Sequence, residues 1–225
     1  MFIVSEEWKA AYPGAAAGIL VMHDVANPAS HPEIDRLRTE LESQLRSRFA
    51  GGDRSALAAL QPIQAYNTYF KRYGKTYHVQ LQLESVGLKG KSIPRVSSLV
   101  EAMFITELKN LLLTAGHDLQ SIQPPIMLGV AKGDERYTLL NGREQVCKAG
   151  DMMMADGQGV ISSVLYGPDQ HTRITADTRQ VIFAVYAPPG IGEPAVRQHL
   201  QDIQSNVLLI APNARVESLA VHGTG

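Results

Sequence analysis

The chain has 225 residues, of which 44% are apolar and 19% charged, enough for one large domain or two small ones with a sizeable buried core. Its formal net charge of −1 excludes a protein that is basic over its whole surface but leaves room for a local basic face. Cys147 is the single cysteine, which excludes an internal disulfide, and the lack of a long apolar run or leader predicts a cytoplasmic protein with no membrane partner.

The first part of the chain alternates one apolar run with amphipathic stretches. Residues 15–25, AAAGILVMHDV, are apolar almost throughout and predict a buried strand. Over residues 32–49 apolar side chains recur at helical spacing, with acids in the first turns and arginines in the last, so this segment predicts a helix ending before Gly51. A second helix is predicted over residues 62–73, ending at Gly74.

The next two segments differ in how clearly they indicate a structure. Residues 79–83 alternate as in a strand, whereas residues 81, 85 and 88 also share one helix face, so both readings stay open. Residues 97–114 predict a helix, because Ser97 or Ser98 can cap it and an acid follows within four residues. Gly116 is expected to terminate that helix.

After Pro125 the pattern changes to short apolar runs separated by Gly, Asn and Asp, which is typical of antiparallel strands. The runs are IMLGVA, RYTLL, MMMAD, GVISSVLYG, TRIT and QVIFAVYAP. A last helix is predicted over residues 193–209, and ARVESLAV is expected to form an edge strand. The sequence thus predicts one composite α+β domain over residues 1–225, helix-rich to about residue 123 and mostly antiparallel strands after that.

Several short motifs can be excluded as cofactor or metal sites. GLKGKSIPR, residues 87–95, contains the Gly-Lys-Ser end of a Walker A loop, but Ser85 stands where the first glycine is required and Pro94 blocks the helix that should follow. The seven histidines have no metal-site spacing, so most are expected at the surface. No Gly-x-Ser-x-Gly elbow is present. The sequence therefore predicts no metal and no cofactor.

Charge is concentrated in one stretch of the chain. Between residues 71 and 95 there are six basic side chains and one acid, and five aromatic residues lie between positions 66 and 77. Basic residues beside aromatic ones suit phosphate contact and base stacking. A solvated helix face with tyrosines half buried in the core explains the same pattern equally well. The basic residues are Lys71, Arg72, Lys75, Lys89, Lys91 and Arg95.

The order of several loose motifs resembles one known family. LESVGLKGKSIPRVSSLVEAMFITELKNLLLTAGHD, and later GDERYTLL, AGDMMMAD and TRITADTRQVIF, resemble the B3/B4 tRNA-binding domain of the phenylalanyl-tRNA synthetase β subunit, especially versions in which that domain stands alone. The resemblance covers about residues 12–190 and leaves the predicted helix and strand of residues 193–221 outside it. It rests on Glu84, Gly90-Lys91, Ile93-Pro94, Leu99-Val100-Glu101 and Gly116-His117-Asp118.

In the synthetase this domain contains an editing centre that hydrolyses tyrosine mischarged onto the phenylalanine tRNA, and the resemblance allows a residue-by-residue comparison. With Glu101 on the family's Asp, Met103 falls on its Thr and Ala115 on its His, while Arg173 falls on its Glu. Met and Ala can neither position a water nor polarise a carbonyl. His117, Asp118 and His171 are the weak candidates for a rearranged catalytic centre.

The resemblance implies three functions. The first is a protein that binds RNA, either tRNA or its aminoacylated end, through Lys89, Lys91, Arg95, Lys71 and Arg72, beside a pocket that includes Glu84, Met103 and Arg173. The second is a trans-editing hydrolase of mischarged aminoacyl-tRNA. The third is a small-molecule binder that takes an amino acid or another anion at Arg173.

Overall fold

The computed structural model describes residues 2–224 of the chain. In this part of the chain there are seven α-helices, one π-helical turn (η1, Glu84–Leu88) and one 3-10 turn (η2, Leu119–Ser121). None of the helices in residues 2–224 has the length and apolar character needed to cross a bilayer. The α-helices are α1 (Glu6–Ala11), α2 (Pro32–Arg48), α3 (Arg54–Ala58), α4 (Gln61–Lys71), α5 (His78–Leu83), α6 (Ser98–Asn110) and α7 (Glu193–Ile210).

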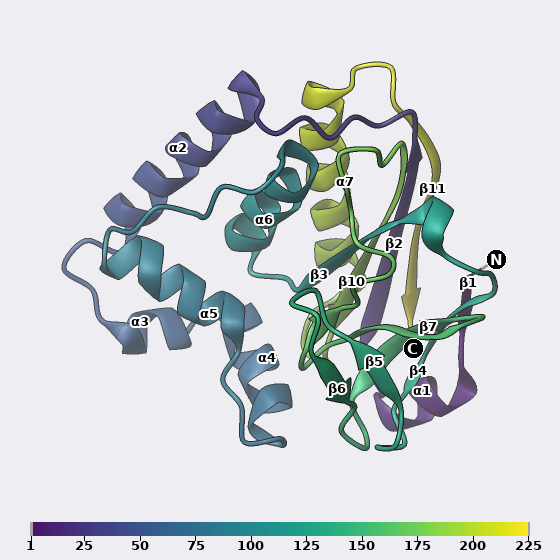
Figure 1. Ribbon diagram of the computed structural model, residues 1–225. Coiled ribbons are helices and arrows are strands. Elements are labelled where there is room, and N and C mark those ends of the chain that lie inside the picture. The colour runs from purple at the N-terminus through teal and green to yellow at the C-terminus, as the bar shows by residue number, and fades with distance from the viewer. Residues whose placement is uncertain (1, 225) are drawn as a thin grey trace.

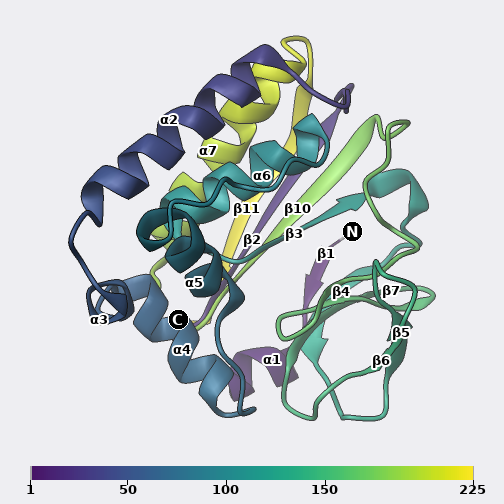
Figure 2. The same cartoon turned by 60° about the vertical axis from the view of Figure 1, so that its left-hand side comes forward.

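A four-stranded antiparallel sheet forms the centre of the molecule, in the order β11-β2-β10-β3. Its strands are β2 (Ala16–His23), β3 (Thr114–Asp118), β10 (Gln180–Ala187) and β11 (Arg215–Gly223). Helices α7 and α6 cover one face of this sheet, and α2 packs on the outer side of these two helices (Figures 1 and 2). α7 lies so close to β2 that a Cβ atom on Gly18 would come within 2.5 Å of Cγ1 of Val196, so glycine at this position sets the distance between helix and sheet.

A second sheet lies on the side of the molecule away from α2 and α7 (Figure 2). Its order is β1-β4-β7-β8-β9, with β1 parallel to β4 and the other neighbours antiparallel. The molecule is thus an α+β fold, with most helices in the first half of the chain and most strands in the second. These strands are β1 (Phe2–Val4), β4 (Ile126–Val130), β7 (Met152–Asp156), β8 (Gly159–Ser163) and β9 (Gly167–Pro168), beside the ribbon β5 (Arg136–Thr138) and β6 (Glu144–Val146).

A buried ion pair joins the outer helix α2 to α6. Nη1 of Arg38 lies 2.7 Å from Oε2 of Glu101, and both side chains are almost wholly buried. The other oxygen of Glu101 accepts a hydrogen bond from the backbone N–H of Val96, 2.9 Å away. Glu101 therefore holds both the packing of α2 on α6 and the loop that leads into α6.

The structure corrects the sequence predictions at three places. The ambiguous residues 79–83 are helical, and η1 continues α5 to residue 88. The helix predicted to reach residue 114 ends at Asn110, because Leu111 takes a left-handed conformation with φ of 61°, and Gly116 lies inside strand β3. TRIT, residues 172–175, is a loop; its hydrogen bonds go to side chains and to neighbouring segments.

Candidate ligand cavity

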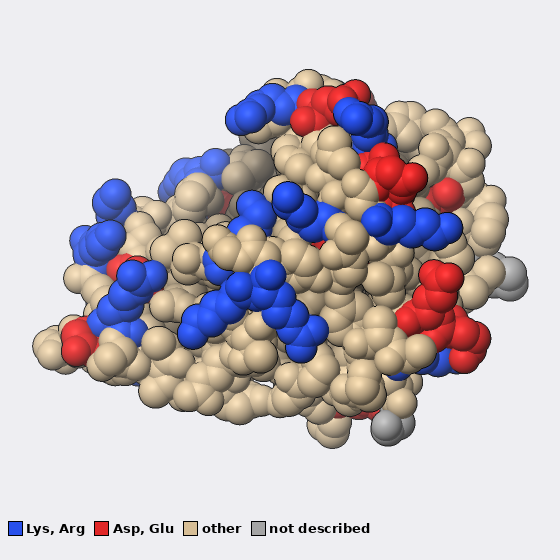
Figure 3. Space-filling model, turned by 90° about the horizontal axis from the view of Figure 1, so that it is seen from below, with Lys and Arg blue, Asp and Glu red and all other residues tan. Residues whose placement is uncertain are grey.

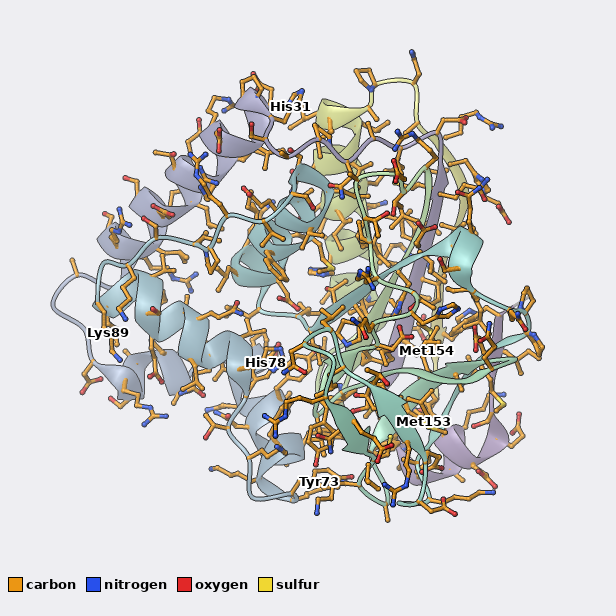
Figure 4. All side chains as sticks on the ribbon, viewed as in Figure 1. His31, Tyr73, His78, Lys89, Met153 and Met154 are labelled. Atoms are coloured by element: carbon orange, nitrogen blue, oxygen red, sulfur yellow. The ribbon has the colours of Figure 1, made fainter. Side chains whose placement is uncertain are left out.

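A cavity of about 490 Å³ lies where α5 and α6 face strands β3 and β10. Most of the side chains around it are apolar, and its wall also includes part of the turn between β5 and β6 and the loop before β10. Figure 4 shows the labelled His78 between the helical layer and these strands. The lining residues are His78, Gln82, Val96, Val100, Met103, Phe104, Glu107, Leu113, Thr114, Ala115, Gly116, Leu140, Ser163, Gly167, Pro168, Arg173, Ile174 and Tyr186.

Three positions that are far apart in sequence meet in this cavity. Met103 comes from α6, Ala115 from β3 and Arg173 from the loop before β10. These are the positions at which the resemblance places the polar residues of the synthetase editing centre. Arg173 is exposed at the edge of the cavity, where its Nη1 donates a hydrogen bond to the carbonyl oxygen of Gln170, 2.9 Å away.

The cavity also contains a buried acid, Glu107, that was not among the candidates from sequence. It is 2% exposed, and its Oε1 accepts a hydrogen bond from the backbone N–H of Thr114, 2.8 Å away. Burial raises the pKa of this carboxyl to about 8. The signal in the sequence was an acid four residues after Met103, on the face of the predicted helix that points inward.

Two other polar side chains of the cavity wall, His78 and Tyr186, are uncharged. Burial lowers the pKa of His78 to about 4, so its imidazole is uncharged at neutral pH. The hydroxyl of Tyr186 on β10 is hydrogen-bonded to that of Ser162 on β8, a strand of the second sheet. Apart from His78 and Tyr186, the ionisable groups of the cavity wall are Glu107 inside and Arg173 at the edge.

The hydroxyl of Thr114 is not activated as a nucleophile. The amide nitrogen of Asn110 donates to Asp202 and lies 3.3 Å from Nδ1 of His199, so Nδ1 is the acceptor and the imidazole proton is on Nε2. Nε2 then donates to Oγ1 of Thr114 over 2.7 Å. An imidazole that donates to the hydroxyl cannot also take its proton, so this network has a structural role.

The catalytic candidates from sequence lie outside the cavity lining. His117 is fully buried in β3, with its Nδ1 2.6 Å from Oγ1 of Thr172, and burial lowers its pKa to about 3. Asp118 accepts a hydrogen bond from the hydroxyl of Thr178. His171 is exposed beside a separate, smaller pocket. The expectation of surface histidines is wrong for His117 and His199, because both imidazoles fill core positions.

Glu84, expected from sequence near the pocket, is not part of its lining. Oε1 of Glu84 accepts hydrogen bonds from Nε of Arg54, at 2.8 Å, and from the side-chain amide of Gln80, at 3.0 Å. These contacts tie η1 to α3 and α5, which is a structural role. Across residues 2–224 there is no group of three His, Cys, Asp or Glu side chains that could hold a metal ion.

The basic residues predicted to contact RNA follow the outer edge of the helical layer. Lys71 is the last residue of α4 and Arg72 follows it, whereas Lys89 and Lys91 lie beyond the far end of η1. Lys and Arg side chains gather on the underside of the molecule with few acids between them (Figure 3). Arg95 differs from the others, because its Nη2 is paired with Asp35 at 3.2 Å.

Two exposed apolar side chains flank the mouth of the cavity. Val96, before α6, is 51% exposed and Leu140, in the turn between β5 and β6, is 52% exposed, and both belong to the cavity lining. They come from the helical layer and from the strand-rich part of the molecule. The mouth thus offers apolar contact as well as the guanidinium of Arg173.

Comparison with known proteins identifies the family. Residues 65–206, more than half of the chain, match the B3/4 domain family, and the chain therefore belongs to that family. No functionally curated protein matches it by sequence. The fold is similar to an N-terminal fragment of the phenylalanyl-tRNA synthetase β subunit from Pyrococcus horikoshii, with 14% identity and a TM-score of 0.50. The match covers 98% of this chain but 53% of the fragment, so the chain spans about half the length of that fragment.

Proposed function

We propose that this B3/4 domain binds the aminoacylated 3′ end of a tRNA, with the aminoacyl group in the cavity and the phosphates along the basic edge of the helical layer. One observation carries the proposal: Met103, Ala115 and Arg173, the positions matched to the synthetase editing centre, line one cavity. The synthetase relationship of the family supports tRNA as the partner.

The size and lining of the cavity suit an aminoacyl group. Ligand sites in proteins have volumes of roughly 300–1,000 Å³ and are mostly apolar with a few placed polar groups, and a cavity of about 490 Å³ lies in this range. The exposed side chains of Val96 and Leu140 at the mouth would contact the terminal nucleotide. Arg173 at the edge would contact its phosphate as a fork of donors.

Lys71, Arg72, Lys89 and Lys91 are proposed to bind the tRNA backbone. All four are exposed, and none forms an ion pair within residues 2–224. The contribution of these cations to tRNA affinity should fall as the salt concentration rises, because binding releases counterions from the nucleic acid. Arg95 is a weaker candidate, since its pair with Asp35 must be shared or broken.

The proposed function is binding rather than hydrolysis. Met103 and Ala115 carry no group that could activate water, and His117, Asp118 and His171 lie outside the cavity lining. Thr114 accepts a hydrogen bond from His199 instead of giving up its proton. Incubation with a panel of mischarged tRNAs checks this point, and we expect no deacylation above the rate in buffer.

The experiment is a titration of fluorescently labelled tRNA at several salt concentrations. We expect the Lys89→Ala/Lys91→Ala and Lys71→Ala/Arg72→Ala variants to bind tRNA more weakly than wild type. In a plot of the logarithm of the binding constant against the logarithm of the salt concentration, each double variant should have a slope shallower by about 1.4, because two contacts to single-stranded phosphates are lost. Arg197→Ala/Arg215→Ala is the charge-matched control, because it removes two exposed cations from α7 and β11, of which Arg215 is paired with Asp24 on the surface. Equal affinity in all variants would overturn the proposal.

A further inference from the structure

Glu107 is a buried carboxyl that the fold leaves half satisfied. Its Oε1 accepts the N–H of Thr114, whereas its Oε2 has no hydrogen-bond donor from any residue between 2 and 224. The residue lines the cavity and its neighbours on α6 are the apolar side chains of Met103 and Phe104. The other titratable groups that line this cavity are His78 on α5, Tyr186 on β10 and Arg173 at its edge.

An acid in such a place costs free energy of folding unless a partner satisfies it. A buried polar group without a partner destabilises a protein by about 1–3 kcal/mol, and a charged one by more. The nearby hydroxyls of Tyr66 and Tyr77 donate to the carbonyl oxygens of Tyr186 and Leu111, so Glu107 has one donor, the backbone N–H of Thr114. Oε2 is open to the cavity, where a molecule bound in it can supply the missing partner.

The chemistry of the cavity selects among ligand classes. An anion would be repelled by the ionised form of Glu107 and could take only the hydrogen bond of the protonated form, and a purely apolar molecule would leave Oε2 without a partner. A primary ammonium supplies three donors and the complementary charge, and its apolar remainder suits side chains such as Val100, Leu113 and Ile174. Water is a poor competitor in a largely apolar cavity, which strengthens a charged hydrogen bond.

From this geometry we infer that Glu107 recognises the free amino group of the ligand, so that the cavity takes an apolar skeleton bearing a primary amine and rejects the same skeleton when the amine is blocked. This deepens the proposed function, on which it rests, because an aminoacyl group carries such an amine. A free amine and the aminoacyl ester of a tRNA both carry this ammonium group. The first experiment below uses free amines and the second uses aminoacylated tRNA, so the two kinds of ligand are tested separately.

Binding of the ammonium should release a proton. Glu107 is mostly protonated at pH 7, since its pKa lies near 8. The ammonium keeps its own proton and pairs with the carboxylate, so the carboxyl proton leaves to solvent. At pH 7 this amounts to about 0.9 proton per ligand bound. A structural role for Glu107 alone would release none.

The first experiment is isothermal titration calorimetry at pH 7 in two buffers of different ionisation enthalpy. The probes are 2-phenylethylamine, its N-acetyl derivative and 3-phenylpropionate. We expect the amine to bind about tenfold or more tightly than the other two, with proton release. Glu107→Gln, whose amide oxygen can keep the Thr114 bond, should lose both the preference and the proton release.

Glu42→Gln is the matched control. Glu42 is a buried acid on α2 that lies outside the cavity, where it accepts the N–H of Ile93 and pairs with Arg46. The preference for the amine should persist in this variant. The inference is overturned if wild type binds none of the probes, if it binds all three equally, or if Glu107→Gln keeps the preference; melting temperatures confirm that each variant is folded.

The second experiment uses a tRNA charged with an apolar amino acid and the same tRNA after N-acetylation. We expect N-acetylation to weaken binding to the level of the uncharged tRNA, and Glu107→Gln to bind both forms equally. If Lys89→Ala/Lys91→Ala and Lys71→Ala/Arg72→Ala lose tRNA binding but wild type shows no preference for the free amine, this inference is overturned and the proposed function is retained. An amine preference with free amines but no binding of any tRNA would retain it and overturn the proposed function.

Discussion

Replacing Glu101 by Gln should test how the cavity is held in place. The change keeps an acceptor for the backbone N–H of Val96 but removes the charge that neutralises Arg38, 2.7 Å away. The guanidinium is almost wholly buried, so it would keep only its contact with Asp35, which is partly exposed. We therefore expect a loss of stability much larger than for a surface pair.

The size of the effect follows from burial. Breaking a buried ion pair by removing one partner costs about 3–5 kcal/mol, and the remaining contact of Arg38 with Asp35 places Glu101→Gln near the lower limit, about 3 kcal/mol. For a chain of this length each kcal/mol lowers the melting temperature by about 2–4 °C, so the decrease should be about 6–12 °C. Glu33→Gln on α2 removes an exposed pair with Arg36 and should cost less than about 1 kcal/mol.

Urea denaturation followed by circular dichroism measures these differences, and the double variant Arg38→Met/Glu101→Leu completes the comparison. Because both charges are then absent, the double variant should be more stable than Glu101→Gln. A cost below about 1 kcal/mol for Glu101→Gln would refute the argument that this pair holds α2 on α6.

Three further predictions concern stability. Because the pKa of Glu107 is raised, the native state keeps a proton that the unfolded state loses above pH 4.5. The free energy of unfolding of wild type should therefore fall by about 1.4 kcal/mol per pH unit, relative to that of Glu107→Gln, between pH 4.5 and about 8. Urea midpoints of the two proteins that stay parallel across this window would contradict the prediction. Gly18→Ala should cost about 1–3 kcal/mol, because its Cβ would overlap Val196, and an unchanged melting temperature would show that α7 can move away. Tyr69→Phe should lower the free energy of unfolding by about 1–3 kcal/mol, because the tyrosine hydroxyl donates to buried Asp151 and accepts the backbone N–H of Met152. Equal urea midpoints for wild type and this variant would show that another donor replaces the hydroxyl.

The parts of the fold that sequence could predict are those with a strong local pattern. Helices α2 and α7 and strand β2 follow from periodicity and length alone. Strand β3 could not be predicted, because Thr114–Asp118 is a strand only through its pairing with β10, more than 60 residues away. The end of α6 at Asn110 depends on the left-handed conformation of Leu111, for which the sequence carries no glycine signal.

The candidate site shows a similar division. The resemblance pointed to Met103, Ala115 and Arg173, and the structure brings these residues to one cavity although they are up to 70 residues apart. Glu107 was missed because an acid on a predicted helix is expected to be solvent-exposed, and only the structure shows that its side of α6 is buried. The ion pair between Glu84 and Arg54 depends on the packing of α3 against η1, which no sequence spacing reveals.

The affinity difference between charged and uncharged tRNA tests the central proposal most directly. The charged form should carry its apolar amino acid through an amide bond, so that it cannot be hydrolysed during the measurement. We predict that wild type binds the charged tRNA more tightly than the same tRNA uncharged, and that Ala115→Met, which fills the cavity from β3, removes this difference while leaving the affinity for uncharged tRNA unchanged. Equal affinities of wild type for the two forms would contradict the proposal that the cavity receives the aminoacyl group.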